Sequence, residues 1–344
     1  MKWMIYGANG YTGTLMAKHA KSLGLQPVLA GRNSEAIHRL ASELELPSTI
    51  VDLTDATALH KALQDIDVVV HCAGPFEVTA APMIEACLAT KTHYTDITGE
   101  LSVFEYAHAQ HQRAVDAGVV LCPGVGFDVI PTDCVAAKLK QKLPDATSLT
   151  LGFDSASRMS RGTAKTSVRR LGEGGAVRNN GKITTVPLAY HTRKIDFGNG
   201  EKFAMTIPWG DVSTAYYTSG IPNIEVYIPA SPNLVKKLKR LNWLRWLLRF
   251  EFMKKFLEKK IDQQPPGPSD KQLEQAITYV WGEARNDKGT VETLRIKVMN
   301  GYKLTSFGGV DVAQFILAQQ PQGGYYTPSM LCGAELVEKY YVEA

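Results

Sequence analysis

Three features that would assign this chain to a whole class of protein are missing from its 344 residues. The five cysteines are scattered without a C-x-x-C pair, and the eight histidines lack metal-ligand spacing, so neither a disulfide framework nor a metal site is predicted. No apolar run reaches the roughly 18 residues that a membrane-spanning helix requires. The N-terminal residues MKWMIYGANG contain neither an apolar leader nor a small-residue cleavage site, which favours a cytoplasmic protein.

The chain also lacks a strong overall charge. Its net charge is only +4, with 21% charged and 44% hydrophobic residues, which is typical of a folded globular protein. The charge is unevenly distributed, because residues 234–262 contain ten Lys and Arg but only three Asp and Glu. This segment therefore carries +7 and the remaining residues −3.

The length predicts two domains, because single hydrophobic cores stop growing at roughly 250–300 residues. Residues 1–143 alternate short apolar runs with helical stretches, which is the pattern of βαβ units and a parallel sheet. Ser34 and Thr54 are expected to cap the second and third helices. Six strands are expected in this part, at residues 2–6, 27–30, 49–51, 67–71, 92–96 and 118–121.

The pattern changes in the second part of the chain. Residues 144–309 contain successive strand-like segments, which predict an α+β domain on a mainly antiparallel sheet, for substrate binding or dimerisation. Residues 310–344 return to helical periodicity and are expected to pack back on the first domain. The predicted fold class is therefore α/β, with a Rossmann-type parallel sheet domain and a second α+β domain.

A glycine-rich turn directly follows the first strand and opens a helix. Its three glycines have a G-x-x-G-x-x-G spacing. Glycines allow positive φ and close backbone approach, and the N–H groups at a helix N-terminus bind a pyrophosphate. Because the turn lies within a βαβ alternation, all seven residues are predicted to bind a dinucleotide: Gly7, Ala8, Asn9, Gly10, Tyr11, Thr12 and Gly13.

The ends of the next strands indicate which dinucleotide is bound. NAD-binding domains carry an acid after the second strand, whereas this chain carries Arg32, whose guanidinium suits a 2′-phosphate. NADP(H) is therefore the predicted cofactor. Asp52, after the third strand, is either an adenine-binding or a turn residue. Small residues after the fourth strand are expected to admit the nicotinamide ribose: Cys72, Ala73, Gly74 and Pro75.

Five sequence blocks, in order along residues 1–135, carry a family resemblance: GANGYTG, LAGRN, VVVHCAGPF, HYTDITGE and CPGVGFDVIPTD. They resemble the saccharopine-dehydrogenase-like NADP-binding oxidoreductases, a group related to trans-acting enoyl reductases of lipid synthesis. The resemblance implies a Rossmann domain with strand order 3-2-1-4-5-6, an inserted α+β substrate domain and NADP-dependent oxidoreductase activity. It does not specify the substrate.

Hydride transfer needs a group that donates a proton or stabilises developing charge. Tyr94 and Asp96 end the fifth strand, at the edge where open α/β sheets bind ligands, and Asp128 lies in the loop after the sixth strand. These three residues are the predicted catalytic residues. The alternative is structural: Asp96 and the neighbouring Glu100 would bind loop amides or a helix N-terminus, and Asp128 would shape its loop.

The predicted function is hydride transfer at a C=O, C=N or C=C bond of a small-molecule or acyl substrate, enoyl reduction included. The alternative is a non-catalytic NADP-binding sensor or scaffold that acts through partners. In residues 234–262, leucines recur at helical spacing beside Trp and Phe, which suits either peripheral membrane contact or a helix packed on the second domain. No nucleic-acid partner is predicted. The sequence is compatible with a homodimer but does not determine the oligomeric state.

Overall fold

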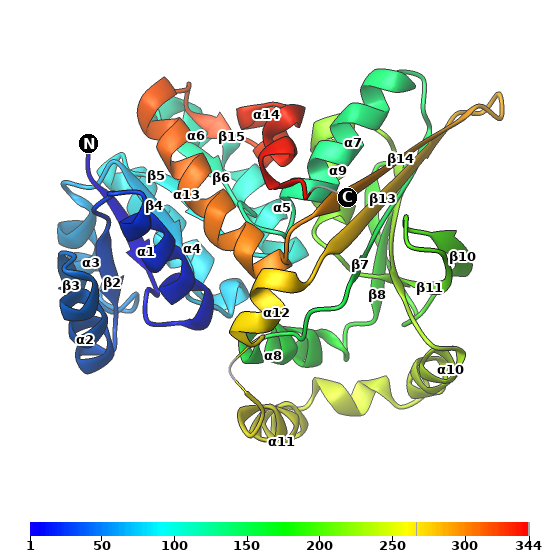
Figure 1. Cartoon of the computed structure of the whole chain (residues 1–344), viewed down its shortest axis with the longest axis horizontal. Coiled ribbons are helices and arrows are strands. Elements are labelled where there is room, and N and C mark those ends of the chain that lie inside the picture. Colours follow the sequence, from blue (N-terminus) through cyan, green and yellow to red (C-terminus); the bar gives the residue numbers. More distant parts are fainter. Residues whose placement is uncertain (266, 343–344) are drawn as a thin grey trace. The chain divides into compact units, whose positions relative to one another are not determined.

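The computed structural model describes residues 1–265 and 267–342, and two compact units can be distinguished in it. Unit 1 consists of Met1–Ile130 and Tyr302–Leu336, and unit 2 of Pro131–Gly301 and Val337–Ala344. Figure 1 labels their helices and strands. The chain passes between the units after Ile130, Gly301 and Leu336, whereas the sequence pattern changes at residues 143 and 309. Residues 343 and 344 of the predicted C-terminal segment lie outside the described residues.

Packing of two helices explains where the units divide. α7 (Ile130–Lys142) follows the sixth strand as a crossover helix would, but its Val135 and Leu139 pack tightly on Gly282 of unit 2. α13 (Gly301–Gln319) begins earlier than the periodicity indicates. Its Gly309 lies against Met16 so closely that a Cβ there would collide with the methionine, and α13 thereby covers the unit 1 sheet.

Unit 1 is built on a sheet whose neighbouring strands all pair in parallel. In the described residues the strand order is β15-β6-β5-β4-β1-β2-β3. The expected 3-2-1-4-5-6 order and the Rossmann-type fold are therefore confirmed, with β15 added beside β6. The strands are β1 (Trp3–Tyr6), β2 (Val28–Gly31), β3 (Ser48–Ile50), β4 (Val68–His71), β5 (His93–Asp96), β6 (Val120–Cys122) and β15 (Gly324–Tyr325).

Helices cover both faces of this sheet, so its central strands are apolar along their whole length. α1 and α2 pack together in one layer, and α3, α4, α5 and α6 pack against one another in another (Figure 1). The unit 1 helices are α1 (Tyr11–Ser22), α2 (Ser34–Leu44), α3 (Ala56–Leu63), α4 (Phe76–Thr90), α5 (Leu101–Ala109), α6 (His111–Ala117), α13 and α14 (Pro328–Cys332). The 3-10 helix η2 (Ala334–Tyr340) begins in unit 1 and ends in unit 2.

The predicted caps of α2 and α3 are each wrong by one residue. Asn33 caps α2, its side chain accepting a hydrogen bond from the Ala36 amide, and Asp55 caps α3 in the same way through Ala58. Ser34 is already the first helical residue, and Thr54 donates to Asp52 instead. Asn and Asp rank with Ser as N-caps, so neighbouring candidates compete.

Unit 2 contains a mixed sheet in the order β10-β11-β12-β7-β13-β14, and β8 pairs with both β12 and β9. β12 and β7 pair in parallel, while the other pairs are antiparallel. The predicted α+β character is thereby confirmed. The strands are β7 (Ser148–Ser155), β8 (Gly175–Asn179), β9 (Lys182–Val186), β10 (Thr192–Asp196), β11 (Glu201–Ile207), β12 (Asn223–Pro229), β13 (Thr278–Arg285) and β14 (Val291–Val298).

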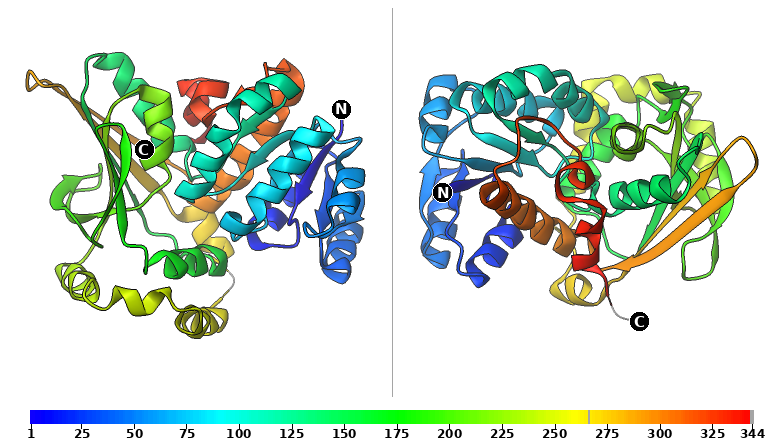
Figure 2. Two further views of the ribbon diagram at one scale, coloured as in Figure 1. Left: turned by 180° about the vertical axis from the view of Figure 1, so that it is seen from behind. Right: turned by 90° about the horizontal axis from the view of Figure 1, so that it is seen from above.

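The helices of unit 2 are mostly short. They are α7, α8 (Arg161–Arg170), α9 (Asp211–Ser219), α10 (Pro232–Leu241), the 3-10 helix η1 (Arg245–Arg249), α11 (Glu251–Asp262) and α12 (Asp270–Gln275). The basic segment, residues 234–262, is thus helical but interrupted, and α10, η1 and α11 follow one another along one side of unit 2 (Figure 2). Among the described residues, no helix is long and apolar enough to cross a membrane.

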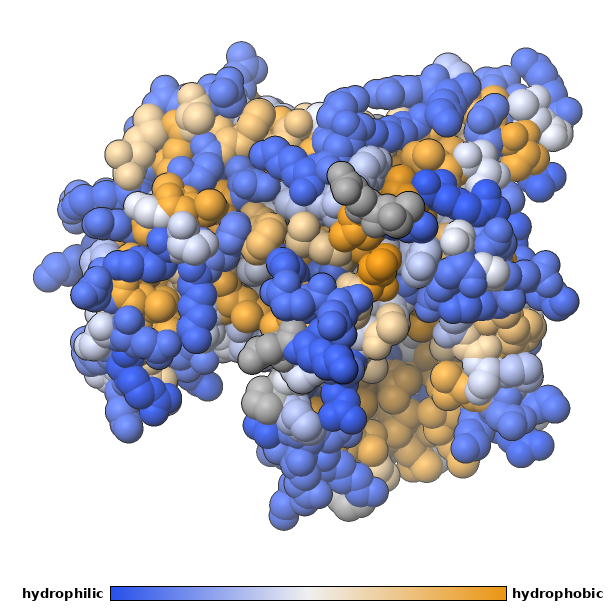
Figure 3. Space-filling view, in the orientation of Figure 1, coloured by the Kyte–Doolittle hydropathy of each residue, from blue (hydrophilic) through white to orange (hydrophobic). Residues whose placement is uncertain are grey.

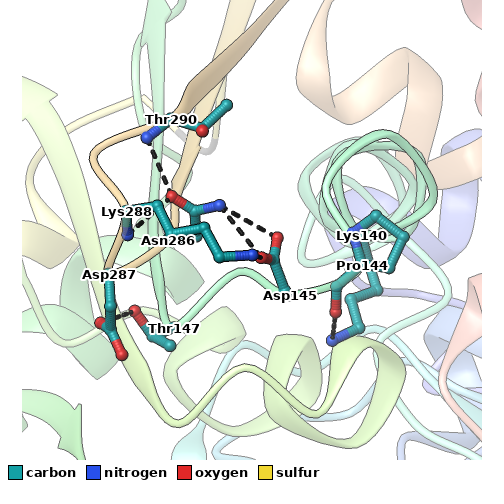
Figure 4. A network of polar contacts seen from close by, with 8 residues as sticks. All are labelled: Lys140, Pro144, Asp145, Thr147, Asn286, Asp287, Lys288 and Thr290. Atoms are coloured by element: carbon teal, nitrogen blue, oxygen red, sulfur yellow. Dashed lines mark hydrogen bonds and ion pairs between the residues drawn. The ribbon is translucent and has the colours of Figure 1, made fainter.

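A polar network joins the β13–β14 turn to the connection between α7 and β7 (Figure 4). The side-chain nitrogen of Asn286 donates to both carboxylate oxygens of Asp145 at 3.1 Å. Its side-chain oxygen accepts from the Lys288 and Thr290 amides at 3.1 and 2.8 Å. Asn286 is buried, so this network stabilises the turn from within.

Candidate functional site

The predicted cofactor residues lie at one edge of the unit 1 sheet. Because its strands run in the same direction, the loops that follow them meet at the carboxyl edge, where ligands bind in folds of this kind. The structure places the glycine turn after β1, Arg32 after β2 and Asp52 after β3. Cys72 to Pro75 follow β4, which lies beside β1. Residues from four separate stretches of sequence thus converge.

The glycine turn is closed by its own backbone and by the β4 loop. The Gly7 amide donates to the Ala30 carbonyl at 2.7 Å, and the Gly10 amide donates to the Gly7 carbonyl at 3.0 Å. Gly7 has φ +81°, and a Cβ there would lie 2.8 Å from both the amide nitrogen and the Cβ of Ala73. A Cβ on Gly13 would collide with the Gly7 carbonyl oxygen. Glycine is therefore required at both positions.

The N-terminus of α1 suits an anion. In the described structure its N-cap, Gly10, provides no capping side chain, and no acidic residue lies in the first turn. Thr14 donates to the Ala8 carbonyl at 3.0 Å, and the Ala8 amide donates to Ala30 at 3.2 Å, so both residues hold the turn in place. A helix start of this kind favours negative charge through its N–H groups and its dipole. It fits a pyrophosphate.

Arg32 and Asp52 lie at adjacent strand ends on the same edge of the sheet. Arg32 is exposed, and no carboxylate occupies the end of β2 in the described chain, which fits a 2′-phosphate. Asp52 accepts two hydrogen bonds through Oδ1, from the amide and the hydroxyl of Thr54, each at 2.9 Å. The Thr54 amide is the main reason that the pKa of Asp52 is lowered, and the charge of Arg32 adds to it. Asp52 is thus a turn residue, and adenine contact stays a prediction.

Cys72 is a packing residue. Its Sγ lies 4.0 Å from Sδ of Met16 and 3.9 Å from the Val70 carbonyl. Burial raises the pKa of the thiol far above its usual range, so it is not a thiolate. The following Ala73 is partly buried and lies against Gly7 of the glycine turn, and Gly74 is exposed.

Tyr94 and Asp96, two of the predicted catalytic residues, are completely buried. The Tyr94 hydroxyl donates to Oδ2 of Asp96 at 2.6 Å, while Oδ1 accepts from the amides of Thr98 and Gly124 at 3.0 and 2.8 Å. Burial raises the pKa of Asp96 to about 6 and that of Tyr94 well above its usual value. Asp96 therefore ties the loop after β5 to the loop after β6, as the structural alternative predicts.

Glu100 performs a similar task for α4. Its two carboxylate oxygens accept from the Phe76 and Glu77 amides, at 3.0 and 2.6 Å, and its own amide donates to the Thr98 hydroxyl at 3.1 Å. The N-cap of α4 is Pro75, which has no side-chain acceptor. Glu100 therefore replaces a local cap and fixes the β4 loop that contacts the glycine turn.

Asp128, the third predicted catalytic residue, is half-buried at the same edge. Its carboxyl lies against Gly99, where a Cβ would collide with it. The loop that carries Asp128 is held by the Val129 amide, which donates to Gly124 at 2.8 Å, and by the Phe127 amide, which donates to the Thr305 hydroxyl at 2.9 Å. Of the three predicted residues, Asp128 alone is not completely buried, although its Oδ1 atom is.

Three further residues at this edge were not predicted as site residues from the sequence. Thr305 and Tyr302 come from α13, and Tyr302 packs edge-on against Tyr11 of the glycine turn, with ring centroids 5.4 Å apart. His71 ends β4 and contacts Thr79 at 3.0 Å through Nε2, and within the described residues its Nδ1 has no hydrogen-bond partner. Burial lowers the pKa of His71 to about 3, so the ring is neutral. Its place in the VVVH strand was the only available signal.

Comparison with known proteins agrees with this geometry. Residues 3–122 match the family model described as the saccharopine dehydrogenase NADP binding domain. A segment of 150 residues is 29% identical to the saccharopine dehydrogenase-like oxidoreductase of Mus musculus, covering 38% of this chain and 35% of that protein. A segment of 138 residues is 31% identical to the trans-acting enoyl reductase of Mycobacterium tuberculosis, covering 38% and 33%. The matches thus span about a third of these curated relatives' length.

A solved structure resembles the whole chain. The apo saccharopine dehydrogenase (L-Glu forming) of Saccharomyces cerevisiae superposes with a TM-score of 0.68, over 99% of this chain and 98% of that one. The sequence identity is 12%, so this likeness shows a common fold alone.

The fold and the carboxyl-edge site together define a dinucleotide-binding protein of the Rossmann class. Within it, residues 3–122 are similar to the saccharopine dehydrogenase NADP binding domain, the resemblance that the five sequence blocks predict. The predicted cofactor, NADP(H), is that of this family of domains.

Proposed function

We propose that the protein is an NADP-dependent oxidoreductase that transfers hydride at a C=O, C=N or C=C bond of its substrate. The observation that carries the proposal is the carboxyl edge of unit 1, where an uncapped helix N-terminus, a glycine turn and Arg32 lie at adjacent strand ends. The names of two curated relatives, an oxidoreductase and an enoyl reductase, support the same chemistry.

The chain's own residues bind and orient the cofactor in this proposal. The turn from Gly7 to Gly13 holds the pyrophosphate against the start of α1, and Arg32 binds the 2′-phosphate. Ala73 and Gly74 allow the backbone to approach the nicotinamide ribose, while Asp96 and Glu100 keep the surrounding loops in place. When bound, NADPH supplies the hydride.

Proton transfer is assigned to Asp128 rather than to Tyr94 or Asp96. The latter two are buried and occupied by each other and by loop amides, so they act as positioning residues. Asp128 is half-buried and lies on the loop after β6, at the edge where the substrate would meet the cofactor. We propose that it donates or accepts the substrate proton.

The first substrates to test are α,β-unsaturated acyl thioesters, because one curated relative is named a trans-acting enoyl reductase. Aldehydes, ketones and cyclic imines form the comparison panel. With NADPH deuterated at C4, deuterium should appear in a product, and mass spectrometry of the products measures it directly. NADPH binding without deuterium transfer to any member of the panel would contradict the proposal and favour the non-catalytic sensor.

Asp128→Asn tests the proton-transfer assignment. The variant should bind NADPH as tightly as the wild type but turn over at least about 100-fold more slowly, the usual contribution of general acid–base catalysis. Asp65→Asn, at an exposed surface carboxylate of unit 1, is the control and should leave turnover unchanged. Turnover of Asp128→Asn at the wild-type rate would refute the assignment.

A further inference from the structure

The basic segment exposes large apolar side chains on unit 2. Trp243 is 86% exposed, Phe252 65% and Trp246 56%, and Leu244 and Phe250 are about half exposed as well. All of them lie between the end of α10 and the start of α11. Figure 3 shows apolar surface at the lower edge of the view, where Figure 1 draws the chain between α11 and α10, with hydrophilic surface on either side. A soluble surface rarely concentrates Trp and Phe in this way without a function.

The exposure is not a consequence of a loosely attached segment. Val235 of α10 is buried in a cluster with Met205 and Ala189, and Leu238 packs against it. The side chain of Asn242 accepts from the Leu188 amide at 2.8 Å and donates to the Leu188 carbonyl at 3.1 Å. The backbone around Trp243 is therefore fixed while its side chain faces outward.

Three of the exposed aromatic rings contact one another. Trp246 meets Phe250 edge-on, with ring centroids 6.0 Å apart, and Phe250 stacks with Phe252 at 5.8 Å. These three rings, with the exposed Trp243 and Leu244 that precede them in the chain, are called here the aromatic patch.

The charges around the aromatic patch are strongly unbalanced. All three acids of the segment are paired: Glu251 with Lys254 at 3.0 Å, Glu258 with Arg169, and Asp262 with Lys165 at 2.6 Å. Two of the three partners come from α8, which is itself basic and contains no acid. In the described chain no ion pair involves the exposed lysines of the segment at positions 236, 237, 239, 255 and 259.

This combination fits the interface of an anionic membrane. Exposed Trp and Phe flanked by Lys are typical of surfaces that insert aromatic rings at headgroup level while lysines contact the phosphates. The cores of protein interfaces are depleted in Lys, and a charge of +7 on each copy opposes self-association. Leucine beside the aromatic rings favours hydrocarbon over stacked bases.

We propose that residues 234–262 form a docking surface for an anionic lipid bilayer, with the aromatic patch inserted between headgroups and the surrounding lysines over lipid phosphates. The protein would bind as a peripheral protein through unit 2. The proposal is independent of the cofactor site, which lies in unit 1.

Sedimentation with vesicles tests this docking surface in the full chain. The wild type should pellet with mixed phosphatidylglycerol–phosphatidylcholine vesicles and at least about tenfold less with phosphatidylcholine alone. Raising the salt from about 0.1 M to about 1 M, which shortens the Debye length from about 10 to about 3 Å, should release it. The fluorescence of Trp243 and Trp246 should shift to shorter wavelength on binding.

Two variants separate the apolar from the electrostatic contribution. Trp243→Ser with Phe252→Ser should weaken binding at least about tenfold. The segment lysine variant combines four substitutions: Lys236→Gln, Lys237→Gln, Lys239→Gln and Lys259→Gln. It should weaken vesicle binding about 100-fold or more, because each lysine near the membrane surface contributes about fivefold to the affinity. The matched control variant removes the same charge from four exposed lysines outside the segment: Lys2→Gln, Lys61→Gln, Lys142→Gln and Lys182→Gln. Its affinity for the vesicles should fall less than about tenfold.

All variants should keep the wild-type circular dichroism spectrum and melting temperature, which shows that unit 2 is folded, and they should bind NADPH like the wild type, which separates this test from that of the proposed function. Absence of salt-sensitive pelleting by the wild type would overturn the proposal. Equal losses in the segment and control lysine variants would overturn it as well. Self-association that Trp243→Ser with Phe252→Ser abolishes, or tighter binding to single-stranded nucleic acid than to vesicles, would assign the surface to another occupant.

Discussion

Glu100 should contribute more to stability than any other carboxylate at the N-terminus of α4. Replacing it by Ala removes two hydrogen bonds that a charged group accepts, at 3.0 and 2.6 Å, and leaves the Phe76 and Glu77 amides without an acceptor. Such bonds contribute about 1.5–3 kcal/mol each. We therefore expect Glu100→Ala to lower the free energy of unfolding of unit 1 by about 3–5 kcal/mol, because Pro75 provides no substitute cap.

Hydrogen exchange followed by mass spectrometry locates this effect. Amides at the start of α4 should lose protection in Glu100→Ala, and the urea midpoint should fall. Glu77→Gln removes an exposed carboxylate from the first turn of the same helix and should cost only about 0.3–1 kcal/mol. If the two variants unfolded at the same urea concentration, with equal protection of α4, capping by Glu100 would be refuted.

Three further substitutions probe the glycine turn, the buried carboxyl and the turn of unit 2. Gly7→Ala should weaken NADPH binding about 10–100-fold by calorimetric titration, because the new Cβ would lie 2.8 Å from Ala73 at a φ of +81°; unchanged affinity would contradict the geometry. Burial raises the pKa of Asp96 to about 6, which is above its value in the unfolded chain. The free energy of unfolding of the wild type, measured relative to that of Asp96→Asn, should therefore be highest below pH ~4 and fall by about 3 kcal/mol as the pH rises to ~7. A difference in urea midpoints between the two proteins that does not change with pH would refute this. Asn286→Ala should destabilise unit 2 by about 2–4 kcal/mol in calorimetry, and the exposed Lys288→Ala by less than about 1 kcal/mol; equal losses would argue against the network.

The first domain could be predicted because its strands are buried on both faces and its cofactor turn is local in sequence. VVVH and WMIY are continuous apolar runs, and helices of about a dozen residues separate the strands. β15 could not be predicted, because Gly324–Tyr325 is a two-residue strand that pairs with Val120 and Leu121. In unit 2, β10 has no strand signal in the sequence, because Thr192–Asp196 is largely polar.

The roles of the residues at the carboxyl edge were harder to predict than their positions. Tyr94 and Asp96 were correctly placed at a strand end, but the sequence does not show that the next loop closes over them through the Gly124 amide. Likewise, Glu100 lies 24 residues after Phe76, whose amide it binds. Such pairings depend on which loops meet in space, and no local pattern encodes them.

The basic segment shows the same limit. Its leucine spacing correctly predicts helical structure, but Leu238 packs inside while Leu244 is exposed. The break at Asn242 causes this difference, because its side chain binds the backbone of Leu188. A helical stripe in the sequence therefore combines residues that face in different directions.

The measurement that tests the central claim most directly is a parallel titration of NADPH and NADH against the wild type and Arg32→Ala. Charge-assisted hydrogen bonds from Arg32 to the 2′-phosphate should make NADPH bind about 10–100-fold more tightly than NADH. Arg32→Ala should abolish that preference and leave the affinity for NADH unchanged. Equal binding of the two cofactors by the wild type, or an undiminished preference in Arg32→Ala, would contradict the account of the site.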